Sequence, residues 1–282
     1  MNGSSFNKKQ FQKIYYQSVD DIFQHWTSDM QAEISRHCYP WREGVMDFKG
    51  YLTASETRYQ VAYKSLCEPG DFDSLCDIGG FYGVFPLTLA RLGHTVTMTE
   101  ALKYYSYSFD PLFTFLQESG VNIINYDPFD EAPPPLETFD VVTVLAVLEH
   151  YPHSLQRFMA NVMKMLKNYG EIYIEVPNIA YWPKRKALLQ GITPLVHISE
   201  IYYSANPFIG HHHEFTMDEL KVLAKISGLD VLKSNYFNYS FRGPVINRVY
   251  SNLLLTLMTL IPSMRECVAI LASRSNSKPN QK

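Results

Sequence analysis

Acidic residues and glycines are spaced along the first third of the chain in a pattern that suits a nucleotide-like ligand. Asp77 lies in an apolar run, and Gly79, Gly80 and Gly83 follow, which allows a tight turn whose backbone N–H groups approach a ligand. Glu100, which comes 21 residues after Gly79, closes the next apolar run, where a carboxylate would accept hydrogen bonds from ribose hydroxyls. We therefore expect a cofactor with an intact ribose 2'-hydroxyl. A sharp turn beside a solvated Glu100 is the structural alternative.

A second reactive pair, Glu149 and His150, follows the apolar run of residues 139–145. An imidazole, with an ordinary pKa of about 6.5, suits the removal of a hydroxyl proton near neutral pH. We predict His150 as the general base, with Glu149 orienting it or lining the pocket. The alternative is a histidine that caps a helix or has a purely structural role.

Three consecutive histidines, His211 to His213, precede Glu214 and raise the question of a metal site, to which His150 and His153 could contribute. Consecutive side chains point in different directions, so we predict no metal. We expect His211 and His213 to line the pocket of the acceptor instead.

The order of apolar runs indicates the elements that must position these side chains. Helical periodicity alternates with short runs at 74–78, 95–99, 121–126, 139–145, 172–176, 229–237 and 268–273. This succession predicts an α/β fold with a doubly wound, Rossmann-like, mostly parallel seven-stranded sheet, whose ligand lies beyond the carboxyl ends of the strands. We expect residues 71–282 to form this core. Residues 1–70 predict an N-terminal helical cap, with a helix over 53–66 that begins at a Thr53-x-x-Glu56 capping box.

One connection in the predicted core is longer than a usual loop between a strand and a helix. Residues 178–214 are rich in aromatic side chains, among them Tyr181 and Trp182, and such a segment suits a lid over an organic acceptor. We predict that this lid insertion binds the acceptor through Tyr181 and Trp182. Aromatic packing against the N-terminal cap is the alternative.

Charge and composition exclude several classes of protein. Lys and Arg total 25 against 28 for Asp and Glu, so the net charge is -3, without the basic excess of a nucleic-acid-binding protein. The four cysteines form no C-x-x-C pair, which argues against a zinc knuckle or disulfide framework and favours the cytoplasm. The longest apolar stretch, 253–261, is too short for a transmembrane segment, which needs about 20 residues. Residues 252–261 could contact the core, a second copy in a homodimer, or weakly a membrane surface.

Several motifs together resemble the class I S-adenosylmethionine-dependent methyltransferases, in particular the small-molecule enzymes of ubiquinone biosynthesis and sugar modification. The motifs are Asp77-x-Gly79-Gly80-x-x-Gly83, Glu100, Asp127, the strand from Phe139 with Val147-Leu-Glu149-His150, Leu166 to Gly170, Val176-Pro-Asn178 and His211-x-x-x-Phe215-Thr216. The resemblance spans residues 73–273 and departs from the family's Gly-x-Gly-x-Gly at Phe81, which stands where the middle glycine is expected.

The resemblance implies S-adenosylmethionine as the cofactor and assigns residues to it. Asp77 and the glycines Gly79, Gly80 and Gly83 would surround the methionine part, and Glu100 would hold the ribose. Asp127 would bond the adenine amino group, unless it only forms a turn before Pro128. Leu145 and Ala146 would contact the cofactor. Arg58 would pair with its carboxylate, unless it is an exposed helix arginine.

The leading functional prediction is methyl transfer to an oxygen, in preference to a nitrogen, of a small metabolite or glycan precursor. A nicotinamide-dependent oxidoreductase shares the sheet and the ribose-binding acid, but its fingerprint needs glycines at Phe81 and Val84. A cofactor-binding protein without catalysis is the third hypothesis. It predicts cofactor binding without product.

Overall fold

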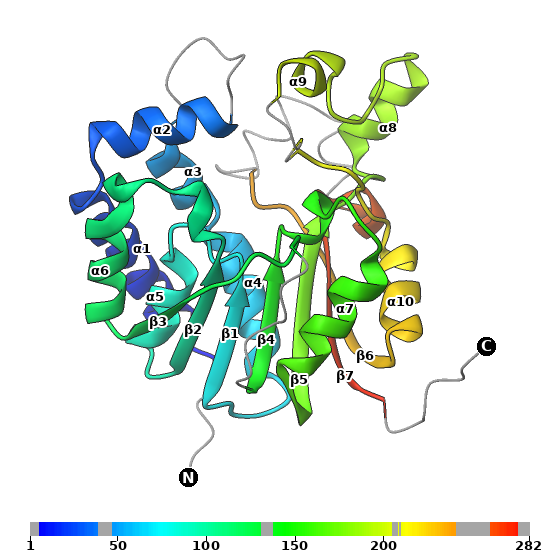
Figure 1. Cartoon of the computed structure of the whole chain (residues 1–282). Helices are drawn as coiled ribbons and strands as arrows, with labels where there is room; N and C mark the ends of the chain where they lie inside the picture. Colours follow the sequence, from blue (N-terminus) through cyan, green and yellow to red (C-terminus); the bar gives the residue numbers. More distant parts are fainter. Residues whose placement is uncertain are drawn as a thin grey trace.

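A seven-stranded sheet forms the centre of the molecule. The computed structural model describes residues 6–38, 47–130, 138–204, 208, 210–240 and 260–275. The strands follow the order β3-β2-β1-β4-β5-β7-β6, and β7 is antiparallel to both of its neighbours while the other pairs are parallel (Figure 1). The predicted doubly wound, mostly parallel sheet is confirmed. Its strands are β1 (Ser74–Ile78), β2 (Thr95–Glu100), β3 (Val121–Asn125), β4 (Phe139–Leu145), β5 (Leu166–Pro177), β6 (Leu229–Phe237) and β7 (Cys267–Arg274).

Helices cover both faces of this sheet, and the predicted N-terminal helices are present. Among the residues that the structure describes before β1, there are four helices, namely α1 (Lys8–Gln24), α2 (Ser28–Cys38), α3 (Phe48–Ala54) and α4 (Glu56–Cys67). The later helices are α5 (Val84–Arg91), α6 (Asp110–Glu118), α7 (Leu155–Lys164), α8 (Trp182–Leu189), α9 (Ile198–Tyr203) and α10 (Met217–Ile226).

Successive residues of the central strands belong alternately to two hydrophobic clusters, one on each face of the sheet. Leu75 of β1 belongs to the cluster with α1, α4, α5 and α6, whereas its neighbour Cys76 belongs to the cluster with α7 and α10. Val141 and Val142 of β4 divide between the two clusters in the same way. Because successive side chains of a strand point to opposite faces, the apolar runs of these strands are buried on both sides.

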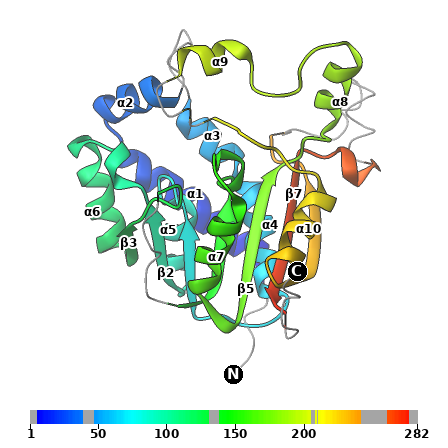
Figure 2. The same cartoon turned by 45° about the vertical axis from the view of Figure 1, so that its right-hand side comes forward.

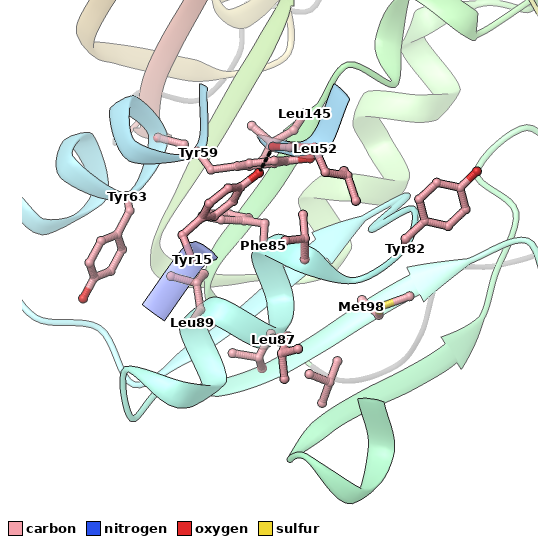
Figure 3. Packing of buried hydrophobic residues seen from close by; sticks show 14 of the residues in the cluster. Tyr15, Leu52, Tyr59, Tyr63, Tyr82, Phe85, Leu87, Leu89, Met98 and Leu145 are labelled. Atoms are coloured by element: carbon pink, nitrogen blue, oxygen red, sulfur yellow. Dashed lines mark hydrogen bonds between the residues drawn. The ribbon is translucent and has the colours of Figure 1, made fainter. Parts of the chain in front are cut away.

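The N-terminal helices pack on the sheet through aromatic side chains. Tyr15 of α1 is fully buried, and its hydroxyl donates a hydrogen bond to the carbonyl oxygen of Leu52 at 2.5 Å (Figure 3). Tyr59 of α4 stacks on Phe85 of α5 with 5.0 Å between ring centroids. The cap and the sheet therefore share one hydrophobic core.

The predicted capping box at Thr53 is wrong. Thr53 lies inside α3, whose first turn is capped by the Asp47 side chain, and α4 starts after Ser55 without a side-chain cap. The predicted helix 53–66 corresponds to α4, which begins only at Glu56, whereas residues 53 and 54 are the end of α3. Both helices contribute side chains to the same hydrophobic core. Local capping signals were outweighed here by tertiary packing.

Two further sequence predictions concern membranes. Within the described ranges, no helix is long and apolar enough to cross a bilayer. Of the predicted helix 252–261, residues 252–259 lie outside the described residues.

Gly83 is a position where the fold requires glycine. Its φ is +75°, and a Cβ there would lie 2.5 Å from Leu116 of α6. We expect Gly83→Ala to lower the free energy of unfolding by about 2–4 kcal/mol, since it combines backbone strain with a clash. Gly93 has a φ of +100° but open space around it, so Gly93→Ala should cost only about 1 kcal/mol. Urea unfolding tests this, and equal losses in the two variants would contradict the packing argument.

Candidate active site

The loops that follow β1, β2, β4 and β5 all lie at one edge of the sheet, which we call the carboxyl edge. Helices α2 and α3 stand beside this edge, and α8 and α9 lie over it in both views (Figures 1 and 2). Because the strands are parallel, residues far apart in the sequence meet here. Of the predicted site residues, the glycine-rich loop, Glu100 and the Glu149-His150 pair end or follow these strands. Arg58 lies on α4, and His211 precedes α10.

The glycine-rich loop makes the expected tight turn after β1. Gly79 has a φ of +67° and its N–H donates to the carbonyl oxygen of Thr99 at 3.0 Å. A Cβ on Gly80 would lie 2.9 Å from Met98, so Gly80 packs directly on β2. Phe81, the departure from the family pattern, takes a φ of +55° and so adopts the left-handed backbone that a glycine would adopt without strain.

Glu100 is held at the end of β2 next to this loop. One carboxylate oxygen accepts the Phe81 N–H at 2.8 Å, and the other accepts the Tyr105 hydroxyl at 3.1 Å. Burial raises the pKa of Glu100 to about 7, against the opposing effect of these hydrogen bonds. The loop and the predicted ribose-binding carboxylate therefore lie within hydrogen-bonding distance of each other.

Asp77 lies next to the start of the loop and is buried. The Thr143 hydroxyl of β4 donates to its carboxylate at 2.6 Å. Burial raises the pKa of Asp77 to about 7. Asp77 is therefore, after Glu100, a second carboxyl group at this edge whose pKa lies near neutral pH.

Asp127 shows features of both of its predicted roles. Its carboxylate accepts the Phe129 N–H at 2.8 Å, which is the turn-forming bond, and it lies 2.9 Å from the ammonium of Lys103. The side chain is buried at the carboxyl edge, after β3.

Arg58 is buried and is not an exposed helix residue. Its Nε lies 3.1 Å from the carboxylate of Glu175 on β5, and its guanidinium stacks over Tyr239 at 4.3 Å from the ring centroid. The N–H of Ala146, which has a φ of +54°, donates to the Glu175 carbonyl oxygen at 3.0 Å. Leu145, the residue before it, is buried in the same cluster as the N-terminal helices.

Glu149 and His150 form a 3₁₀ turn (Leu148–His150) after β4. The Glu149 side chain is 1% exposed, and its pKa rises to about 8 because of burial and then because of the nearby charge of Glu175. The His150 ring meets the His211 ring edge to face, with 4.7 Å between centroids. The structure therefore brings Glu149, His150 and His211 together although sixty residues separate the last two.

Side chains of the lid insertion, the histidine triplet among them, line an open cavity of about 580 Å³. His211 and His213 line it, as predicted, whereas Tyr181 and Trp182 are not among its lining residues. Tyr181 precedes α8 and Trp182 begins it. The other side chains in the lining are Thr193, Leu195, Val196, Ile198, Ile201, Phe208, His212 and Glu214.

Sequence reasoning missed Glu175, and it named Glu214 only beside the histidine triplet without giving it a role in the site. Glu175 is fully buried, and a charged residue inside the apolar run 172–176 was the signal that could have found it. Glu214 accepts from His211 Nδ1 at 2.9 Å and pairs with Lys184 of α8. These contacts hold its pKa below the ordinary value despite burial. No local pattern pairs Glu214 with α8.

A protein-family model described as a methyltransferase domain matches residues 51–234, which is more than half of the chain. The protein is a class I S-adenosylmethionine-dependent methyltransferase. The match covers the glycine-rich loop, Glu100, Asp127 and the Glu149-His150 pair of this methyltransferase. By sequence, no curated protein matches the chain significantly.

Solved structures of methyltransferases share the fold. The 1,6-didemethyltoxoflavin-N1-methyltransferase of Burkholderia thailandensis, solved with S-adenosylhomocysteine, has 15% identity and a TM-score of 0.50, with 82% of each chain covered. The magnesium protoporphyrin IX methyltransferase of Synechocystis PCC 6803 has 13% identity and a TM-score of 0.53, covering 92% of this methyltransferase and all of that chain. A Mesorhizobium loti methyltransferase has 13% identity and a TM-score of 0.51, covering 78% and 98%. The family makes S-adenosylmethionine the cofactor.

The raised pKa of Glu100 predicts how stability depends on pH. Between its ordinary value of 4.5 and about 7, the folded methyltransferase keeps a proton that the unfolded chain releases, so stability falls as pH rises. We expect the free energy of unfolding to fall less between about pH 5 and pH 8 in Glu100→Gln than in wild type. Asp140→Asn is the control, because the Asp140 pKa of about 2 lies below this window. A Glu100→Gln slope equal to that of wild type would contradict the prediction.

Proposed function

We propose that this methyltransferase moves a methyl group from S-adenosylmethionine to an oxygen, in preference to a nitrogen, of a small metabolite or glycan precursor. The observation that carries the proposal is the meeting of His150 with His211, which lines the lid cavity. An imidazole in the lining of a partly apolar cavity, with a second imidazole in contact with it, suits an organic acceptor with an ionisable hydroxyl group.

Methyl transfer requires that the acceptor oxygen is aligned with the methyl group, and that another group accepts the proton of the acceptor hydroxyl. S-adenosylmethionine supplies an electrophilic methyl group on a cationic sulfur when it is bound. His150 takes the hydroxyl proton as general base while the acceptor oxygen forms its bond to the methyl carbon and the sulfur–methyl bond breaks, which leaves S-adenosylhomocysteine. Glu149, beside it, orients His150 or lines the pocket, and His211 and His213 hold the acceptor. We also assign acceptor contact to Tyr181 and Trp182 in a closed position of the lid.

The cofactor contacts are proposed for residues that the structure gathers at the carboxyl edge. Asp77 and the glycine-rich loop surround the methionine part, and Glu100 takes the ribose by exchanging its bonds to Phe81 and Tyr105 for bonds to the hydroxyls. The remaining contacts come from Asp127 to the adenine, from Leu145 and Ala146 to the body of the cofactor, and from Arg58 to the carboxylate. Buried carboxylates at this edge favour a cationic ligand.

The proposal extends to the domain organisation of this methyltransferase, its partners and its cellular compartment. We propose that residues 1–70 act as a cap on a catalytic core of residues 71–282, that the lid selects a small-molecule acceptor, and that nucleic acid is not a partner. Cys67, Cys76 and Cys267 are free thiols, which supports a reducing compartment such as the cytoplasm.

The cofactor assignment predicts that Glu100→Ala weakens binding of S-adenosylhomocysteine by at least about tenfold, the loss expected for one charge-assisted hydrogen bond. Isothermal titration calorimetry measures this directly, with Asp140→Asn as the control variant and NAD as the control ligand. Tight binding of NAD, or full binding by Glu100→Ala, would contradict the assignment.

The catalytic assignment predicts that His150→Ala lowers kcat by about 100-fold or more while S-adenosylhomocysteine binds as in wild type. The acceptor comes from a screen for S-adenosylhomocysteine release with hydroxylated small molecules and their matched amines. His153→Ala, which removes an exposed histidine, is the control. Unchanged kcat in His150→Ala contradicts the base assignment, and product from the amines alone contradicts the oxygen acceptor.

A further inference from the structure

Three side chains at the end of β4 and before α10 have the geometry of a metal site. Glu149, His150 and His211 each offer one ligand atom, and these atoms lie within 4.8 Å of one another. The two loops are fixed together by the backbone, because the N–H groups of His212 and His213 donate to the Glu149 carbonyl oxygen at 2.7 and 3.3 Å. The juxtaposition is therefore built into the fold.

The Glu149 carboxylate forms no ion pair of its own among the described residues. It is 1% exposed, and neither oxygen has a hydrogen-bond partner there. The guanidinium of Arg58, which attracts it, is paired with Glu175, whose own charge repels Glu149. A buried ionised carboxylate is costly unless it is paired or binds a metal ion, so a cation is the group that this position needs.

The ring of His211 is oriented as in known metal sites. Its Nδ1 lies 2.9 Å from Glu214 Oε1, while Lys184 bonds the other Glu214 oxygen. This arrangement leaves Nε2 to act as a ligand atom, and a carboxylate on the far nitrogen is the usual support for a metal-binding histidine.

We infer that Glu149, His150 and His211 bind one divalent transition-metal ion beside the acceptor cavity. Two imidazoles and one carboxylate suit zinc, manganese, iron or cobalt better than the all-oxygen preference of magnesium or calcium. Three protein ligands leave coordination positions open, as in catalytic rather than structural sites.

This inference rests on the proposed function and narrows the acceptor. A hydroxylated molecule with a second oxygen nearby would chelate the ion, which lowers the pKa of the bound hydroxyl group. Its proton would pass to solvent water. The oxygen would then form its bond to the methyl carbon as the sulfur–methyl bond of S-adenosylmethionine breaks, which leaves S-adenosylhomocysteine. In this arrangement His150 is a metal ligand and not the general base. The test below distinguishes these two roles.

The histidine triplet explains why the sequence led us to predict no metal. Only His211 belongs to the cluster, since His212 Nε2 lies 2.9 Å from the Phe208 carbonyl oxygen and His213 lies 3.5 Å from Glu219. Consecutive histidines do point in different directions. The other two ligands, Glu149 and His150, come from the loop after β4.

Cobalt binding to the whole 282-residue chain, stripped of metals by a chelator, tests the site without an acceptor. Visible absorption of bound Co²⁺ should saturate at one ion per chain, and Zn²⁺ should displace it. We expect His211→Ala and the isosteric Glu149→Gln to weaken binding at least about tenfold, and Glu214→Gln by about tenfold through the orientation of His211. His153→Ala should bind as wild type does, and circular dichroism checks that each variant is folded.

The outcomes separate the inference from the proposed function. Absence of stoichiometric binding, or equal binding by wild type and His211→Ala, overturns the metal site. The same samples are titrated with S-adenosylhomocysteine. If they bind it but not the metal, the metal inference alone fails, and His150 remains the proposed base. If wild type binds no S-adenosylhomocysteine, the proposed function fails as well.

Discussion

Parallel pairing of β1, β2, β4 and β5 is the constraint on which the site depends. Parallel strands place all their carboxyl ends at one edge, and the helices that return the chain cover both faces. The loops at that edge are therefore the part of the sheet that neither helical layer covers. Asp77, Glu100, Glu149 and Glu175 meet there because each lies at or just beyond the end of a different strand.

This concentration of carboxylates is costly for the fold. Asp77, Glu149 and Glu175 are almost completely buried, and among these Glu175 is paired with a buried cation, Arg58. Burial raises the pKa of each carboxyl group, which means that the folded protein disfavours their ionised forms. A cationic cofactor and a metal ion would both relieve this cost. Binding at the carboxyl edge and stability of the fold are thus linked.

The N-terminal helices and the lid differ in how they contact this edge. Helices α1 and α4 share the hydrophobic core with the sheet through Tyr15 and Tyr59, so they are part of the folded body. Helices α8 and α9 expose many of their large apolar side chains, among them Leu188, Leu189 and Ile198. The ion pair between Lys184 and Glu214 ties α8 to the loop that carries His211. Both partners lie within the lid insertion, so this ion pair holds two parts of the lid together. The ring contact between His211 and His150 joins the lid to the site.

Local patterns along the chain were enough to predict the sheet, the glycine-rich loop and the carboxylate that ends β2. These features depend on local patterns, namely apolar runs buried on both faces and glycines where a positive φ is needed. The motifs also predicted the methyltransferase family, since they lie in order along one stretch. Tertiary structure alone decided the pairing of Arg58 with Glu175, the division of α3 from α4, and the meeting of His150 with His211. Each of these depends on which elements pack together, and no local pattern records a contact between segments so far apart in the chain.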